Sequence, residues 1–328
     1  MPAPYPWQTH HWSRLLDMRA RMPHSILLAG PRGVGKLALA QAWAKSLLCE
    51  SPTQDGDACN ACEACHWFDS GTHPDYLHQG LLEKENRDGE VKQATEISVD
   101  QARQAVDFVQ LSTYRAGRRL VLIEPAEAMN NAAANALLKV LEEPPINTLF
   151  VLLSHQPRQL LPTILSRCHK IELGLPYASA MQSWLKANSL NELALAWSGG
   201  APLAALNARE MGELALRQTV GEQLASPEHL DCVTLAEGWN KSVSASLWHR
   251  CGYKWLLDLL ACRLGGEPLF NPDFARPLQQ LASKADLAAL LDFARQESQS
   301  GRWVDHPLNR QMLMEAWLVQ YAAIFEGK

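Results

Sequence analysis

The chain has 328 residues, of which 47% are hydrophobic and 20% are charged, which is enough for two or three globular domains with buried cores. Its formal net charge of -5 excludes a strongly basic nucleic-acid-binding body, so any contact with DNA is expected to be local or shared with partners. No segment reaches the roughly 18 consecutive apolar residues of a membrane span, and the N-terminus lacks the apolar core of a signal peptide, so we expect a cytoplasmic protein without membrane contact.

The first motif lies between a predicted strand and a predicted helix. Residues 8–21 are predicted to be helical, and the apolar run at residues 25–29 is short enough for a buried strand. The sequence GPRGVGK then follows the pattern G-x-x-x-x-G-K of a phosphate-binding loop, and residues 36–48 have helical spacing. In such a loop, backbone N–H groups and the helix N-terminus surround the phosphates. The candidate nucleotide-binding residues are Gly30, Gly33, Gly35 and Lys36.

The next position departs from this motif. Leu37 stands where phosphate-binding loops carry Ser or Thr, whose hydroxyl holds Mg²⁺. The glycines and Lys36 favour nucleotide binding, whereas the alternative is a tight glycine turn between strand and helix, with a vestigial site. ATP or ADP therefore stays open as a cofactor, and hydrolysis is a separate question on which Leu37 argues against Mg²⁺ placement.

Four cysteines follow the predicted helix with the spacing C-x9-C-x2-C-x2-C. Successive CxxC spacings suit a tetrahedral Zn²⁺ site, and in a reducing compartment a cysteine cluster indicates metal before disulfides. A site in which cysteine fills every position is closed, so its predicted role is structural, pinning an inserted loop at residues 49–65. His66 and His73 lie nearby and could compete as ligands. The predicted zinc ligands are Cys49, Cys59, Cys62 and Cys65.

Between this insertion and the middle of the chain the signals are weaker. Residues 73–77 are predicted to enter a strand, and the polar stretch at residues 80–96 is predicted to be a loop. A helix begins near residue 97, with Ser98 or Asp100 as its cap. The basic turn at residues 114–119 could touch phosphate, although a solvated loop is the more common explanation.

The centre of the chain predicts an α/β crossover unit. Residues 119–124 and 148–154 are continuous apolar runs, as expected of strands buried on both faces of a parallel sheet. Between them, residues 131–143 have the apolar spacing of a helix, which Pro144 and Pro145 end. Strand, helix and strand form one crossover unit of a parallel sheet.

The end of the first of these strands bears on catalysis. In an active ATPase of this layout the strand ends in adjacent carboxylates, of which one helps to hold Mg²⁺ and one polarises the attacking water. Here the two positions are Glu124 and Pro125. Proline cannot act as a base, so this is a second, independent indication against hydrolysis.

The remainder of the chain is predicted to be helical. Short helices are expected at residues 178–187 and 190–197, before a boundary near Asn207. In the longest later segment, at residues 243–264, apolar residues recur at helical spacing, which indicates core or subunit interface rather than a cofactor site. The other predicted helices lie at residues 214–224, 230–239, 285–296 and 307–325.

These features together resemble the clamp-loader branch of the AAA+ proteins. The resemblance is carried by residues 130–145 (NNAAANALLKVLEEPP), by the cysteine insertion and by Ser166-Arg167-Cys168, while the C-terminal half matches only in helical character and at residues 308–313. It implies an α/β AAA+ core with a parallel sheet of the P-loop type and a zinc-binding insertion, then a small helical lid and an all-α collar. The implied domains are residues 1–173 (with the zinc module at 49–65), 174–207 and 208–328.

The resemblance also implies roles for individual residues. Arg167 corresponds to the arginine finger, which reaches into the ATP site of a neighbouring subunit and stabilises transition-state charge. The alternative is that Arg167 pairs with a carboxylate of its own chain. Ser154 stands where the family's first sensor has a polar residue, and residues 199–206, which should carry the arginine of the second sensor, contain none. With Leu37 and Pro125, three elements of hydrolysis are missing.

The favoured hypothesis is a non-hydrolysing clamp-loader subunit of the DNA polymerase III holoenzyme. It would organise the loader ring and donate Arg167 to a neighbouring ATPase during sliding-clamp loading in DNA replication, with no catalysis of its own expected. The implied partners are gamma/tau and delta subunits in a heteropentamer, and the clamp and primed DNA through that complex. The first alternative is an ATP-hydrolysing motor subunit of the gamma or tau type. The second, a zinc-ribbon nucleic-acid module, is opposed by acidic residues around the cysteines.

Overall fold

The computed structural model describes residues 4–85, 91–114, 117–300 and 310–325. They form two compact units, Met1–Trp184 and Leu185–Lys328. The finer division into core, lid and collar stays a prediction. No helix of the described residues has the length and apolar character needed to cross a membrane.

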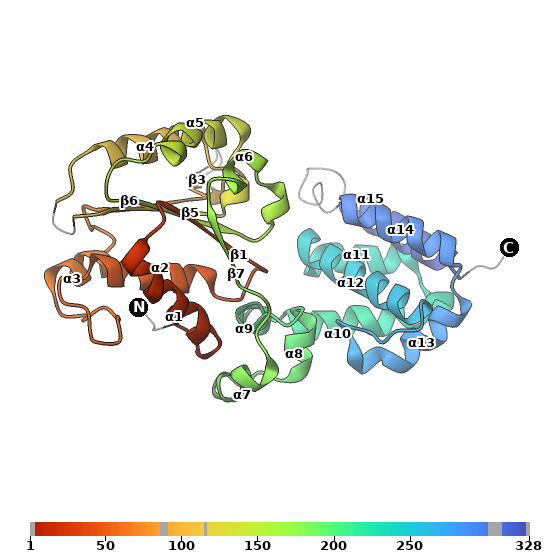
Figure 1. The fold of residues 1–328 in the computed structure, drawn as a ribbon. Coiled ribbons are helices and arrows are strands. Elements are labelled where there is room, and N and C mark those ends of the chain that lie inside the picture. Colours follow the sequence, from red (N-terminus) through yellow and green to blue (C-terminus); the bar gives the residue numbers. More distant parts are fainter. Residues whose placement is uncertain (1–3, 86–90, 115–116, 301–309, 326–328) are drawn as a thin grey trace. The chain divides into compact units, whose positions relative to one another are not determined.

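The first unit is built on a five-stranded parallel sheet with the strand order β2-β5-β6-β1-β7 (Figure 1). The apolar runs predicted as buried strands form its centre, because neither face of those strands is exposed to water. The edge strand β7 was not predicted, since only its Ile171 is buried. The strands are β1 (Ser25–Ala29), β2 (Tyr76–Gly80), β5 (Arg119–Glu124), β6 (Thr148–Ser154) and β7 (His169–Glu172).

Helices cover both faces of this sheet. In Figure 1, α4 (Val99–Gln110) and α5 (Asn131–Glu142) lie on one face, and α1 (Thr9–Asp17) and α2 (Lys36–Leu48) lie on the other. The apolar stripes of α4 and α5 pack on the sheet in one buried cluster. Ser98 is the cap of α4, and its hydroxyl accepts a hydrogen bond from Gln101 N.

Two expectations for this unit need correction. The predicted helix at residues 8–21 is divided into α1 and a 3₁₀ turn, η2 (Met18–Arg21). Part of the predicted loop at residues 80–96 forms an antiparallel pair of short strands, β3 (Glu83–Glu85) and β4 (Val91–Gln93). Polar composition alone does not exclude a hairpin, because the backbone hydrogen bonds of an exposed pair need no apolar face.

The second unit is helical. Its core gathers large aromatic side chains, in which Tyr321 OH donates to Leu224 O at 2.7 Å and accepts from Trp255 Nε1 at 2.9 Å. Trp197, within the predicted lid, is 1% exposed and belongs to the same core. Helix α7 (Ala178–Ala187) spans the boundary between the units. The helices that follow are α8 (Glu192–Trp197), α9 (Pro202–Glu210), α10 (Glu213–Leu224), α11 (Cys232–Ser242), α12 (Ala245–Arg263), α13 (Ala275–Lys284), α14 (Leu287–Ser300) and α15 (Arg310–Ala323).

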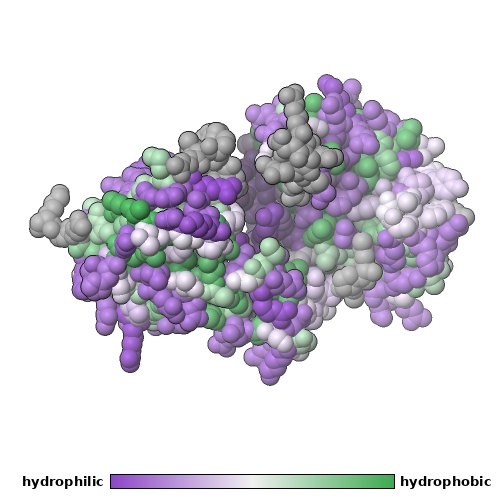
Figure 2. Space-filling view, turned by 180° about the vertical axis from the view of Figure 1, so that it is seen from behind, coloured by the Kyte–Doolittle hydropathy of each residue, from purple (hydrophilic) through white to green (hydrophobic). Residues whose placement is uncertain are grey.

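The described helices after residue 208 agree with the sequence pattern except at α13, which was not predicted. The first residues of the helix predicted at 307–325 lie outside the described residues, and so do Leu308 and Asn309 of the family-like segment. On the face drawn in Figure 2, hydrophobic side chains form small areas between hydrophilic ones. Such scattered exposure is normal for a protein surface.

Candidate functional site

The predicted phosphate-binding loop is held at its first residue. Gly30 N donates to Ser154 O at 3.1 Å, and Leu173 N donates to Ala29 O at 2.7 Å, so the ends of β6 and β7 both contact the start of the loop. A Cβ atom at Gly30 would lie 2.0 Å from Leu173 O. Only glycine fits there, because the atom that blocks a side chain belongs to the backbone.

Lys36 is folded back onto the loop. Its side chain is 3% exposed, and Nζ donates to Gly30 O at 2.7 Å and to Pro31 O at 2.8 Å. Burial lowers the pKa of Lys36 to about 8, although the carboxylates of Glu124 and Glu127 oppose this shift. Burial also raises the pKa of Glu124, while the Lys36 charge counteracts that rise. The structure therefore brings together the charges of Lys36, at the start of α2, and Glu124, at the end of β5.

Two residues that the sequence analysis did not assign join this group. Glu127 lies in the 3₁₀ turn η3 (Ala126–Ala128), and its Oε1 accepts a hydrogen bond from His155 N at 2.9 Å. Burial, with a contribution from the Lys36 charge, lowers the pKa of His155 to about 4, so this imidazole is neutral at physiological pH. A search for adjacent carboxylates at a strand end does not find Glu127, because Pro125 and a turn separate it from the strand.

The N-terminal segment holds the loop from another direction. Gln8 is 1% exposed, and its Nε2 donates to Val34 O at 3.0 Å and to Gly35 O at 2.9 Å. The indole Nε1 of Trp7 also donates to Val34 O at 3.0 Å. Tyr5 stacks on Trp7 with ring centroids 4.8 Å apart. These contacts fix Gly35 in its left-handed conformation, with φ of 89°, at the point where α2 begins.

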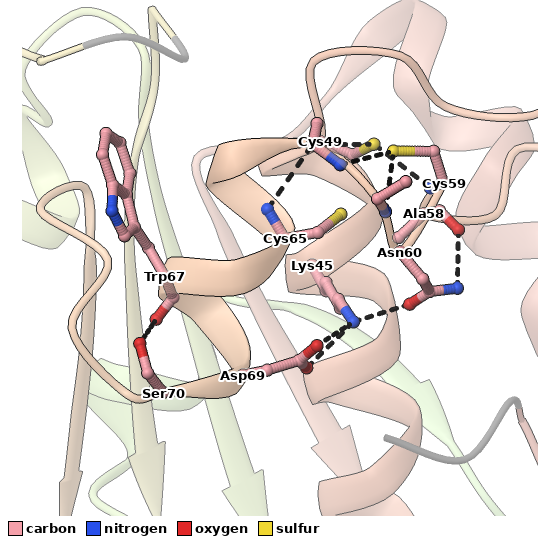
Figure 3. Close-up of polar contacts among 11 residues, drawn as sticks. Lys45, Cys49, Ala58, Cys59, Asn60, Cys65, Trp67, Asp69 and Ser70 are labelled. Carbon is pink, nitrogen blue, oxygen red and sulfur yellow. Dashed lines mark hydrogen bonds and ion pairs between the residues drawn. The ribbon is translucent and has the colours of Figure 1, made fainter.

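The four predicted metal ligands lie together, and Figure 3 shows three of them, Cys49, Cys59 and Cys65. The sulfur atoms of Cys49, Cys59, Cys62 and Cys65 are all within 4.8 Å of one another, and Cys49 Sγ lies 3.9 Å from Cys62 Sγ. Backbone N–H groups point at these sulfurs, from Cys59 to Cys49 Sγ at 3.3 Å and from Cys62 to Cys59 Sγ at 3.3 Å. Such N–H donors stabilise thiolates. The donor set therefore fits a soft, four-coordinate metal ion.

Protonation of the thiols follows their surroundings. N–H groups of Ala61 and Cys62 lower the pKa of Cys59 to about 6, whereas burial raises the pKa values of Cys49 and Cys65. A cation at the centre would favour the thiolate at every position. Of the two nearby histidines, His73 is buried, and its Nδ1 accepts from Asp75 N at 3.1 Å. The structure does not bring His66 or His73 into the cysteine cluster.

The cysteine loop is fixed to the rest of the first unit by two cationic side chains. Lys45, on α2, is 3% exposed and donates to Asn60 Oδ1 at 2.6 Å and to the Asp69 carboxylate at 2.8 and 2.9 Å (Figure 3). Asp69 ends α3 (Glu63–Asp69), a helix that the sequence analysis missed. Arg19 Nη2 donates to Gly56 O at 2.9 Å, between Cys49 and Cys59 in the same loop.

Arg167 lies on the surface between α6 (Pro162–Leu165) and β7. Its Nη1 donates to Thr163 O at 2.9 Å and to Ser166 Oγ at 3.1 Å, and its Nη2 forms an ion pair with Glu142 at the end of α5. The side chain is 30% exposed. The pairing with a carboxylate of its own chain, considered above as the alternative to a finger, is therefore present when the chain is alone.

Arg119, in the predicted basic turn, is held within the fold. Arg119 is 6% exposed, its Nε donates to Leu111 O at 2.9 Å, and it lies 3.8 Å from Asp75. These contacts tie the turn to the start of β2 and β5, so Arg119 has a structural role. Arg115 lies outside the described residues.

The sequence was compared with known proteins. Residues 8–176 match the family described as DNA polymerase III, delta subunit, and residues 212–322 match its C-terminal family. The chain is 42% identical over 334 residues to the DNA polymerase III subunit delta' of Pseudomonas aeruginosa, which covers 98% of each chain. It is 31% identical over 291 residues to the delta' subunit of Escherichia coli, which covers 85% of this chain and 83% of the relative.

A second type of subunit matches more locally. The DNA polymerase III subunit tau of Escherichia coli is 33% identical over 153 residues, which are 47% of this chain and 22% of the relative. The two relatives above that align over 98% and 85% of the chain are delta' subunits, and two matches to delta-subunit families cover both halves. The protein therefore belongs to the family of DNA polymerase III delta' subunits.

Proposed function

We propose that this chain is a non-hydrolysing subunit of a clamp loader, which organises the loader ring and donates Arg167 to a neighbouring ATPase. One observation carries the first part of the proposal: two groups that ATP hydrolysis needs are absent, one just after the phosphate-binding loop and one just after β5. Leu37 replaces the Mg²⁺-binding hydroxyl, and Pro125 replaces the second carboxylate after β5.

The groups around Lys36 support this assignment. Glu127 is the next carboxylate after the position of the missing base, Pro125, but its Oε1 already accepts a hydrogen bond from His155 N. His155 itself is neutral near pH 7 and lies beside the Lys36 ammonium, which opposes its protonation. A loop of this kind can hold phosphate through Lys36 and backbone N–H groups without activating water.

The surroundings of Arg167 support the second part. Its contact with Glu142 is at the surface, where the carboxylate side chain is 47% exposed, and surface ion pairs contribute about 0–1 kcal/mol. A terminal phosphate carries more charge than a carboxylate and offers oxygens that fit the guanidinium fork. Exchange of Glu142 for a partner's phosphate therefore costs Arg167 little free energy.

We propose a structural Zn²⁺ in the cysteine cluster. In a tetrahedral site with Zn–S bonds of about 2.3 Å, neighbouring sulfurs are about 3.8 Å apart. The 3.9 Å between Cys49 Sγ and Cys62 Sγ fits this spacing. The metal would join Cys49, at the end of α2, to α3, and so close the inserted loop on itself.

The wider assembly follows from family membership as a proposal. We expect a heteropentamer with gamma/tau and delta subunits, contact with the sliding clamp and primed DNA through that complex, and a cytoplasmic location. The lid at residues 174–207 and the collar at 208–328 are proposed as separate functional parts, of which the collar holds the ring together. ATP or ADP in the phosphate-binding loop is also a proposal.

Turnover measurements test this function. The isolated chain is expected to hydrolyse no ATP. In the reconstituted loader, Arg167→Ala is expected to lower ATP hydrolysis at the site of the neighbouring subunit, here called the served site, by about 10³-fold. This is the low end of the effect of arginine fingers. The control is Arg103→Ala, since Arg103 is also an exposed arginine and its carboxylate partner, Asp100, is on its own helix. If the isolated chain hydrolyses ATP and Lys36→Ala abolishes the activity, the chain is a motor subunit instead.

Nucleotide binding should depend on pH through Lys36. Its ammonium form attracts phosphate and predominates below pH about 8, so affinity for ADP is expected to fall as pH rises through that value. Between about pH 7 and about pH 9 the loss should be about tenfold. Calorimetric titration of the chain with ADP measures it. Lys36→Met should bind more weakly at both pH values and without this dependence; an equal pH dependence in Lys36→Met would contradict the assignment to Lys36.

A further inference from the structure

A serine at the start of β1 holds the backbone of Arg167. Ser25 is 1% exposed, and its Oγ donates to Arg167 O at 2.5 Å. The two residues are 142 positions apart in the sequence, so no local motif reveals the contact. On its other side, Arg167 N donates to Ile164 O at 3.1 Å. Both backbone groups of Arg167 are therefore fixed, one by α6 and one by the sheet.

The position of Ser25 in the sheet explains why a side chain is needed. Backbone pairing between β1 and β7 begins at Ile26 and His169 and runs to Ala29 and Glu172. Ser25 and Arg167 lie just before the first pair, where the chain turns from α6 into β7. The Ser25 hydroxyl extends the strand pairing to the residue that carries the guanidinium. All five residues of β1 are buried, which makes this strand a rigid support.

We propose that Ser25 is a positioning residue for Arg167, an inference that rests on the proposed role of Arg167 as an arginine finger. Ser25 keeps the Cα of Arg167 fixed on the sheet while the guanidinium exchanges Glu142 for the partner's phosphate. The guanidinium of Arg167 also donates from Nη1 to Thr163 O. Catalytic groups must be held closely, because a misplacement of about 1 Å can cost about 10²-fold in rate.

The test is a double-mutant cycle on ATP hydrolysis by the reconstituted clamp loader. Ser25→Ala is expected to lower kcat at the served site by about tenfold with KM for ATP unchanged, because the finger acts on the chemical step. In the Arg167→Ala background, Ser25→Ala should have no further effect beyond about twofold. A serine that only stabilised the fold would lower the rate equally in both backgrounds.

A matched control is Ser46→Ala. Ser46 is 2% exposed, its Oγ donates to a backbone carbonyl, Trp43 O, at 2.8 Å, and the same Oγ accepts from Arg19 Nη2 at 2.6 Å. This change removes at least as much buried hydrogen bonding as Ser25→Ala, without contact to Arg167, so kcat should stay as in the unaltered chain. If Arg167→Ala lowers kcat but Ser25→Ala does not, the positioning role is wrong and the finger stands. If Arg167→Ala itself has no effect, the proposed function fails, and the positioning role fails with it.

Discussion

Replacing Cys65 with serine is expected to abolish zinc binding by the chain and to lower its free energy of unfolding by about 3–5 kcal/mol. Cys65 is 1% exposed and belongs to α3, whose far end is held to α2 by the Lys45 and Asp69 pair. Without the metal, the Cys49 thiol keeps the raised pKa that burial gives it, and no metal ion joins Cys49 to α3. We therefore expect residues 49–65 to open while the sheet stays folded.

Metal content and hydrogen exchange measure this effect. The unaltered chain should contain one equivalent of zinc, and amide exchange should increase in Cys65→Ser at residues 49–65 but not in β5. The control is Cys262→Ser, which changes a partly buried cysteine outside the cluster. Full stability of Cys65→Ser, or equal destabilisation by both substitutions, would show that the four cysteines pack without a metal.

The central sheet was predictable because burial on both faces leaves a direct mark on the sequence. Strands β1, β5 and β6 have the predicted bounds, since each is a continuous apolar run. The edge strand β7 reads HKIE and has a single buried residue, so its pairing with β1 depends on tertiary context. Helix α3 was missed for a similar reason, because seven residues that include one of the four clustered cysteines carry little helical periodicity.

The candidate site divides in the same way. Lys36 and the four cysteines were found because their chemistry depends on local spacing. Their partners come from distant segments: Gln8 contacts the loop across 27 positions, and Glu142 meets Arg167 across 25. A single sequence contains no signal for such pairs, since each residue type is common and each contact arises only when strands and helices pack. Ser25 is the extreme case, because its neighbours predict only that it begins a strand.

Gly30→Ala is expected to lower the free energy of unfolding by about 3 kcal/mol and to displace the phosphate-binding loop. The added Cβ would lie 2.0 Å from Leu173 O and 3.0 Å from Leu173 C. Both atoms belong to the backbone directly after β7, so relief requires movement of the strand or of the loop. Movement of the loop would also break the bond from Gly30 N to Ser154 O. Chemical denaturation measures the change in stability. Titration with ADP measures the nucleotide affinity, which falls if the loop is displaced.

The control is Gly174, the residue that follows Leu173. Gly174 has no heavy atom within 4 Å of a Cβ position, so Gly174→Ala should change stability by less than about 1 kcal/mol. Because β7 starts just after Arg167, the two outcomes of Gly30→Ala differ in where they act. If the loop moves, ADP affinity falls and the Arg167-dependent rate is kept; if β7 moves, the Arg167-dependent rate falls as well. Unchanged stability of Gly30→Ala would mean that Leu173, after β7, is not in close steric contact with the loop at Gly30.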